Sequence, residues 1–360
     1  MRDAIAYPAT DQWSTRESRY NRQMSALVPR ASGDAAAPRT EAPWTTRRLL
    51  AWMSGYFQER EIDSPRIVAE MLLAHVLACP RMRLYMEVDR PASGAELATL
   101  RGLVARAGAG EPVQFLIGEA FFYWRGFQVG RCTLIPQPST ETLVDHVLQR
   151  FRERGEAVRS PEPHDDSAPI APATAPPRAL SSDGPRIADI GTGTGCIAVS
   201  LAAQMPRAEV VATDILPEAL ELARANARRY GVEDRIDFRL GAGVEPLVAA
   251  AEQADRFDAL CANPPYIPDD EVSAMDDSVR RHVPRTAWYG GADGLSVIAP
   301  LIGAAGRFLV PGGILAIEIA DRHRDRVLAL VRQQTDLQNG RVLKDHEGFW
   351  RVLVAERASG

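Results

Sequence analysis

Strand-like and helix-like segments alternate from Ile187 onward, and this alternation constrains the fold more than any other feature of the 360-residue chain. The expected strands are RIADI, AEVVATD, RIDFRLG and RFDALCA, and the expected helices among them are CIAVSLAAQ and PEALELARANARRYG. Such alternation predicts a parallel sheet with helices on both faces. We therefore expect a Rossmann-like, doubly wound α/β domain over residues 185–360.

The last part of this domain departs from the parallel pattern. A helix near 294–309, the strand GGILAIEIA and a helix through Gln333 continue the alternation. The final strands, near 340–346 and 349–355, are separated by too few residues for a crossover helix. We therefore expect these two strands to form a C-terminal antiparallel hairpin.

Apolar residues three and four positions apart predict helices in the segment 45–110. The second helix is expected to begin with Ser64 as its cap and Pro65 in its first turn, and Ser93 with Glu96 has the spacing of a capping box at the start of the third. These signals predict a small helical-bundle domain over residues 44–112. Aromatic and β-branched residues after it predict a hairpin, followed by a connecting helix, over residues 113–156.

Two segments lack any periodic apolar pattern. Residues 1–43 mix Ala, Pro, Arg, Ser and Asp, and residues 157–184 are dense in Pro and Ala. Such compositions predict a disordered N-terminal tail and a flexible linker or insertion.

Composition narrows the function classes. No run approaches the roughly 18 to 20 apolar residues that cross a bilayer, and the N-terminus has no apolar signal core, so we expect a cytoplasmic protein without membrane contact. A net charge of −5 argues against direct nucleic-acid binding. The four cysteines have no CxxC spacing, and the histidines are dispersed. We therefore expect no metal site.

A glycine-rich turn between the first strand and its helix predicts a ligand site. Its members are Gly191, Thr192, Gly193, Thr194 and Gly195. Such a turn lets a ligand approach the backbone at a helix start. It also fits the GxGxxG/A pattern of NAD sites, which is the alternative.

Two acidic residues favour a different cofactor. Asp189 would repel a pyrophosphate, but it can receive a cationic amino group. Asp214, at the end of the second strand, can accept hydrogen bonds from both hydroxyls of a ribose. Together the two acids indicate S-adenosylmethionine.

The stretch NPPYI, Asn263 to Ile267, follows a strand and forms a stiff loop because proline cannot continue a sheet. Together with DIGTGTG, GEPVQFLIG, GGADGL and GGILAIEI, it resembles the HemK-like (PrmC) protein glutamine methyltransferases over residues 46–356. The resemblance implies that S-adenosylmethionine methylates the side-chain amide of the glutamine in the GGQ motif of peptide chain release factors. It also implies that the helical domain recognises the substrate.

This resemblance gives roles to the stiff loop. The side-chain oxygen of Asn263 and the carbonyl of Pro264 would accept the two N–H bonds of a planar acceptor and align its nitrogen with the methyl group. Asn263 would also lie against the cofactor. Pro265 and Tyr266 would complete the acceptor site, with the tyrosine ring packed on the flat acceptor.

Several positions depart from the family pattern. The segment IPQPST has Gln137 and Ser139 where an arginine and an acid are usual, and Val283 precedes Pro284 where a glutamate is common. Ala242 and Gly243 replace an acid and an aromatic residue. These changes leave open a methyltransferase for a small N-, O- or S-nucleophile, or a non-catalytic binding protein with this fold.

Overall fold

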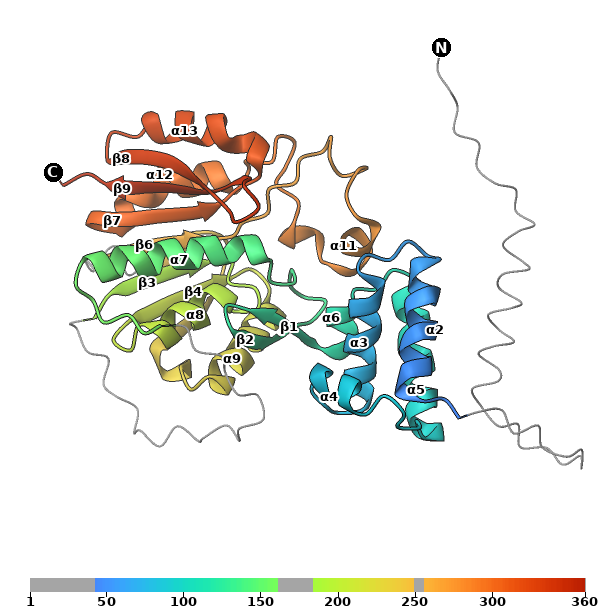
Figure 1. Ribbon diagram of the computed structural model, residues 1–360. Helices are drawn as coiled ribbons and strands as arrows, with labels where there is room; N and C mark the ends of the chain where they lie inside the picture. Colours follow the sequence, from blue (N-terminus) through green and yellow to red (C-terminus); the bar gives the residue numbers. More distant parts are fainter. Residues whose placement is uncertain (1–42, 161–183, 249–255, 360) are drawn as a thin grey trace, which may run out of the picture. The chain divides into compact units, whose positions relative to one another are not determined.

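The computed structural model describes residues 43–160, 184–248 and 256–359 (Figure 1). The expected tail over 1–43 and the expected linker over 157–184 therefore lie almost entirely outside the described residues. The chain divides into two compact units, one ending at Ile117 and the other beginning at Gly118. Each is described here by itself.

The first unit is helical, as the apolar spacing predicts. Its helices are α2 (Thr46–Gln58), α3 (Pro65–Val76), α4 (Arg81–Met86), α5 (Gly94–Gly108) and α6 (Val113–Ile117). Apolar side chains at helical spacing, such as Met53 and Phe57 on α2 and Leu72 on α3, are fully buried in one cluster. Burial of this shared cluster holds the bundle together.

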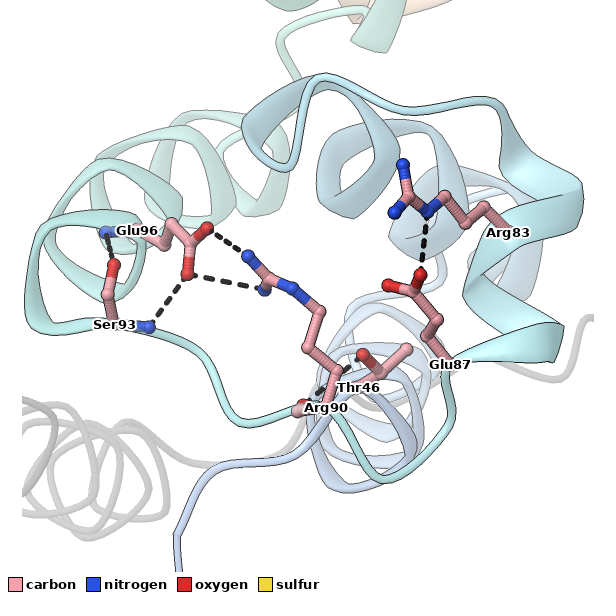
Figure 2. A network of polar contacts seen from close by, with 6 residues as sticks. All are labelled: Thr46, Arg83, Glu87, Arg90, Ser93 and Glu96. Carbon is pink, nitrogen blue, oxygen red and sulfur yellow. Dashed lines mark hydrogen bonds and ion pairs between the residues drawn. The ribbon is translucent and has the colours of Figure 1, made fainter.

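The expected helix starts have different outcomes. Ser93 caps α5, because its hydroxyl accepts from the Glu96 N–H and the Glu96 carboxylate accepts from the Ser93 N–H at 2.7 Å. Arg90 also pairs with Glu96 at 2.7 Å and lowers the pKa of that carboxyl to about 2 (Figure 2). Ser64 makes no side-chain cap and has a left-handed backbone, whereas Pro65 does occupy the first turn of α3.

The second unit opens with the hairpin β1 (Glu119–Phe122) and β2 (Arg125–Gln128), followed by α7 (Pro138–Glu153). Its main sheet has seven strands, namely β3 (Arg186–Ile190), β4 (Glu209–Asp214), β5 (Ile236–Leu240), β6 (Phe257–Ala262), β7 (Leu309–Glu318), β8 (Leu337–Lys344) and β9 (Trp350–Arg357). The remaining helices are α8 (Cys196–Gln204), α9 (Pro217–Arg229), α11 (Asp277–His282), α12 (Ile298–Phe308) and α13 (Arg324–Arg332), with one-turn 3-10 helices at 233–235, 245–247, 285–287 and 321–323.

The strand order β5-β4-β3-β6-β7-β9-β8 confirms the doubly wound prediction (Figure 1). Strands β3 to β7 pair in parallel, and the last two strands form the expected antiparallel pair. Alternate residues along β3 face opposite clusters, with Ile187 on the side of α7 and α8 and Ala188 on the side of α12 and α13. Helices therefore cover both faces of the sheet.

The differences from the sequence prediction are local. Val113–Ile117 is helical rather than part of the hairpin, which begins only at Glu119. Helices α4 and α11 have six residues each, too few for apolar spacing to reveal them. The helix expected near 294 begins at Ile298.

The sheet topology brings the predicted site residues together. Strand β3 lies between β4 and β6, and Ile190 pairs with Thr213 on one side and with Ala262 on the other. The glycine turn, Asp214 and Asn263 therefore leave the sheet at the same carboxyl edge. Ligands of open α/β sheets bind at this kind of strand-order reversal.

Candidate active site

The glycine turn follows β3 and opens α8. Gly191, Gly193 and Gly195 have φ values of 72°, 55° and 80°, which glycine adopts without steric cost. A Cβ atom on Gly193 would meet nothing closer than 3.9 Å, whereas one on Gly195 would lie 3.1 Å from the Ala223 Cβ. Gly193 thus leaves space beside the backbone, and Gly195 permits close packing of α8 on α9.

Asp214 ends β4 and lies on the wall of the same cavity as Gly193. Its Oδ2 accepts from the Gly193 N–H at 2.9 Å, and its Oδ1 accepts from the Leu216 N–H at 3.0 Å. These bonds fix the carboxylate and leave each oxygen with capacity for a further donor. A ribose diol has the two donors that this arrangement fits.

Asp189 is fully buried beneath the turn and does not line the cavity. Its Oδ2 accepts from the Thr192 hydroxyl at 2.7 Å and from the Ala198 N–H at 3.1 Å, so the side chain ties the turn to α8. Within the described part of the chain, its Oδ1 has no hydrogen-bond partner. Burial raises the pKa of Asp189 to about 7, and Oδ1 is the atom left for a cationic amino group.

Asn263 follows β6 and begins the proline loop. Its Nδ2 donates to the Thr140 hydroxyl at 3.1 Å, and Pro264 and Pro265 follow it along the cavity wall. Tyr266 does not line this cavity, and its ring packs against the cluster on the α12 side of the sheet. The expected packing of this ring on a flat acceptor thus finds no support in the cavity lining.

The cavity has a volume of about 430 Å³, within the usual range for small-ligand sites. Its wall joins segments that are far apart in the sequence, among them 132–136, 190–194, 214–216, 241–243, 263–265 and 285–287. Ala242 and Gly243 are on this wall, as expected for positions near a cofactor. Gln137 and Ser139 are not.

Sequence reasoning missed Thr140 and Glu318, which join the site through hydrogen bonds. Thr140 lies on the cavity wall, and its hydroxyl donates to the buried Glu318 carboxylate at 2.6 Å. A signal for Glu318 was present in the sequence, because a lone charge ends the apolar strand GGILAIE. Burial raises the pKa of Glu318, against the opposing effect of its hydroxyl donors.

Two thiols on the wall do not supply a nucleophile. Burial raises the pKa of Cys196 to about 12 and also raises the pKa of Cys132, so both stay protonated at neutral pH. In the described ranges, no group of three or more His, Cys, Asp or Glu side chains could hold a metal ion. Asp214 is the one carboxylate on the described wall.

Known proteins match both units. Residues 48–118 match the family described as PrmC N-terminal domain, and residues 178–281 match the methyltransferase small domain. A protein of Geobacter sulfurreducens called release factor glutamine methyltransferase is 37% identical over 316 residues, which cover 87% of this chain and 98% of that protein. The chain belongs to the release factor glutamine methyltransferase family. A Chlorobaculum tepidum protein with the same description is 38% identical over 283 residues, covering 78% of this chain and 86% of its own length.

Membership in the release factor glutamine methyltransferase family decides between the open alternatives for the cofactor. The chain is an S-adenosylmethionine-dependent methyltransferase, so the NAD and non-catalytic interpretations are set aside. The Asp214 carboxylate oxygens can accept hydrogen bonds from ribose hydroxyls, and Gly193 leaves space beside its backbone. Both features fit this cofactor. Among the described residues, no helix is long and apolar enough to cross a membrane.

Proposed function

We propose that this enzyme methylates the side-chain amide nitrogen of the glutamine in the GGQ motif of peptide chain release factors. The observation that carries the proposal is the position of Asn263 and Pro264, which lie on the wall of the cavity that Gly193 and Asp214 also line. The descriptions of the relatives support the same acceptor.

The chain's residues would hold the two reactants in line. When bound, S-adenosylmethionine would supply a methyl group on a positively charged sulfur, which would leave as a neutral thioether, and the methylated nitrogen would lose one N–H proton to solvent. Asp214 would hold the ribose hydroxyls, whereas Asp189 lies off the cavity wall and would hold the glycine turn against α8 from beneath. Asn263 Oδ1 and the Pro264 carbonyl would accept the two N–H bonds of the acceptor amide and direct its nitrogen at the methyl carbon.

The polar groups of the site favour positioning over strong base catalysis. Asp214 accepts from two backbone N–H groups and would use its remaining capacity on the ribose, and the thiols on the wall are protonated. An amide nitrogen is a weak nucleophile because its lone pair is delocalised. Hydrogen bonds that fix the amide and draw electron density toward nitrogen therefore supply much of the rate.

The positions of Gln137 and Ser139 in the IPQPST segment do not favour a small-molecule acceptor. Gln137 is exposed and donates to the Ile135 carbonyl at 2.9 Å, while the Ser139 hydroxyl donates to Glu318 at 3.1 Å. Neither side chain is on the cavity wall. These two departures from the family pattern therefore do not line the described cavity.

The test is transfer of a labelled methyl group from S-adenosylmethionine to purified release factor, with a small-molecule extract as the competing acceptor pool. We expect label in the release factor, and mass spectrometry should place it on the GGQ glutamine. Release factor with this glutamine changed to alanine is the matched control and should stay unlabelled. Label in a small metabolite, with none in the release factor, would overturn the proposal.

A further inference from the structure

A buried carboxylate connects α7 to the end of β7, outside the cavity wall. Glu318 is fully buried, and its two oxygens accept from two neighbouring hydroxyls in the first turn of α7. Ser139 donates to Oε1 at 3.1 Å, and Thr140 donates to Oε2 at 2.6 Å. Only the second of these hydroxyls goes on to contact the site, because Thr140 also receives the Asn263 side-chain N–H at 3.1 Å.

Glu318 determines which atom donates and which accepts in each hydrogen bond of this series. An ionised carboxylate can only accept hydrogen bonds, and a hydroxyl has a single hydrogen to donate. Once that hydrogen of Thr140 is directed at Glu318, the Thr140 oxygen can serve Asn263 only as an acceptor. Asn263 must then turn Nδ2 toward Thr140, and its Oδ1 faces the other way.

The opposite orientation would disable the proposed acceptor site. Were the Thr140 hydroxyl free to donate, it could bond Oδ1 and leave Nδ2 to face the cavity. A donor there would oppose the N–H groups of an acceptor amide rather than accept from them. In the described structure no hydrogen bond engages Asn263 Oδ1, and that atom is not buried.

We propose that Thr140, oriented by Glu318, is a positioning residue that sets the side-chain amide of Asn263 so that its oxygen faces the acceptor. This inference rests on the proposed function, because it assumes that the acceptor presents N–H groups to Asn263. It adds two residues, far from Asn263 in the sequence, to the groups that determine which acceptors the site selects.

A purely structural role would make the same hydrogen bonds, since Glu318 also fastens α7 to the sheet. Ser139 separates the two roles. Its hydroxyl and that of Thr140 donate to the same carboxylate, but the hydrogen bond from Asn263 in the described structure goes to Thr140, and Ser139 does not line the cavity. Ser139→Ala is therefore a matched control for the loss of one donor to Glu318.

The experiment compares kcat and KM for release factor in Thr140→Val, Thr140→Ser and Ser139→Ala. We expect Thr140→Val to lower kcat by about 10- to 100-fold, because the amide is no longer held in its reactive orientation. Thr140→Ser, which keeps the hydroxyl, and Ser139→Ala should both stay within about threefold of the wild type. Equal losses in Thr140→Val and Ser139→Ala would overturn the inference in favour of a structural role.

A double-mutant cycle checks that Thr140 acts through Asn263. In the Asn263→Ala background, Thr140→Val should change kcat by less than about threefold, because the group that it positions is already gone. A full 10- to 100-fold loss in that background would show that Thr140 acts on its own and would contradict the inference.

A measurement without turnover separates this inference from the proposed function. The side-chain NH2 signals of Asn263, identified by their loss in Asn263→Ala, should shift in Thr140→Val and stay in place in Ser139→Ala. Unchanged signals in folded Thr140→Val would overturn the positioning role. Absence of methyl transfer to release factor by the wild type would instead contradict the proposed function, and the NMR comparison would still decide the orientation of Asn263.

Discussion

The Asp214 carboxylate accepts the backbone N–H of Gly193 at 2.9 Å, so the acid at the end of β4 also fixes the glycine turn after β3. Asp214→Ala should remove this bond and the acceptors for the ribose. We expect S-adenosylmethionine binding to weaken by about 1.5 to 3 kcal/mol, the range for hydrogen bonds to a charged group. Calorimetry on the folded variant measures this loss.

Asp237→Ala is the control for Asp214→Ala, because Asp237 is an exposed acid on the neighbouring strand β5 and pairs with Arg239. Its cofactor affinity should match that of the wild type. Unchanged affinity in Asp214→Ala would remove Asp214 from the cofactor site.

Asp189 should make stability depend on pH. Its pKa is about 7 in the folded protein and about 3.9 in an unfolded chain, so the folded state holds a proton between these values that the unfolded state releases. Its contribution to stability is complete below about pH 4 and is lost as pH rises through about 7. Urea unfolding at pH 5 and pH 8 should show a larger fall in free energy for the wild type than for Asp189→Asn. Parallel pH profiles would contradict this account.

The same carboxyl should link cofactor affinity to pH. If Asp189 Oδ1 receives the amino group of the cofactor, binding favours the ionised acid, and affinity should increase between pH 6 and pH 8. Calorimetry should show this increase in the wild type and a flat profile in Asp189→Asn. An equal increase in both proteins would assign the effect to another group.

The two glycines of the turn should differ in their tolerance of a methyl group. Gly195→Ala meets both a positive φ and a contact of 3.1 Å with Ala223, and it should cost about 1 to 3 kcal/mol for overpacking beyond the backbone strain. Gly193→Ala meets only the strain, of about 1 to 2 kcal/mol. Thermal unfolding should therefore rank Gly195→Ala as the less stable variant, and the reverse order would contradict the assigned roles.

Ser139→Glu, which introduces the acid usual in the family, should destabilise this enzyme. The Ser139 hydroxyl donates to the buried Glu318, so a glutamate there removes a donor and adds a like charge beside a carboxylate. We expect the melting temperature of the variant to lie further below that of the wild type at pH 8 than at pH 5, because protonation at the lower pH relieves the repulsion between the two carboxylates. Stability equal to that of Ser139→Gln at both pH values would show that the introduced acid avoids Glu318.

The sequence was most informative where one local pattern determines one element. Alternating strands and helices predicted the sheet, and the positions of Asp214 and Asn263 after strands predicted that they would meet at its carboxyl edge. The antiparallel end followed from the short separation between β8 and β9 alone.

The parts that the sequence missed depend on contacts between distant segments. Thr140 and Glu318 are 178 positions apart, and nothing local indicates their hydrogen bond. Asp189 could be recognised as an acid near the turn, but whether it lined the cavity or lay beneath it depended on the packing of β3 and α8. Tyr266 likewise follows the proline loop in sequence, yet its ring turns toward the core.

The most direct test of the account is the turnover of Asn263→Ala on release factor, measured together with its affinity for S-adenosylmethionine. If Asn263 aligns an acceptor amide, kcat should fall by about 10²- to 10³-fold, while cofactor affinity changes by no more than a few fold. Turnover near that of the wild type in the folded variant would contradict the account, because an amide held by Asn263 could not then be the group that reacts.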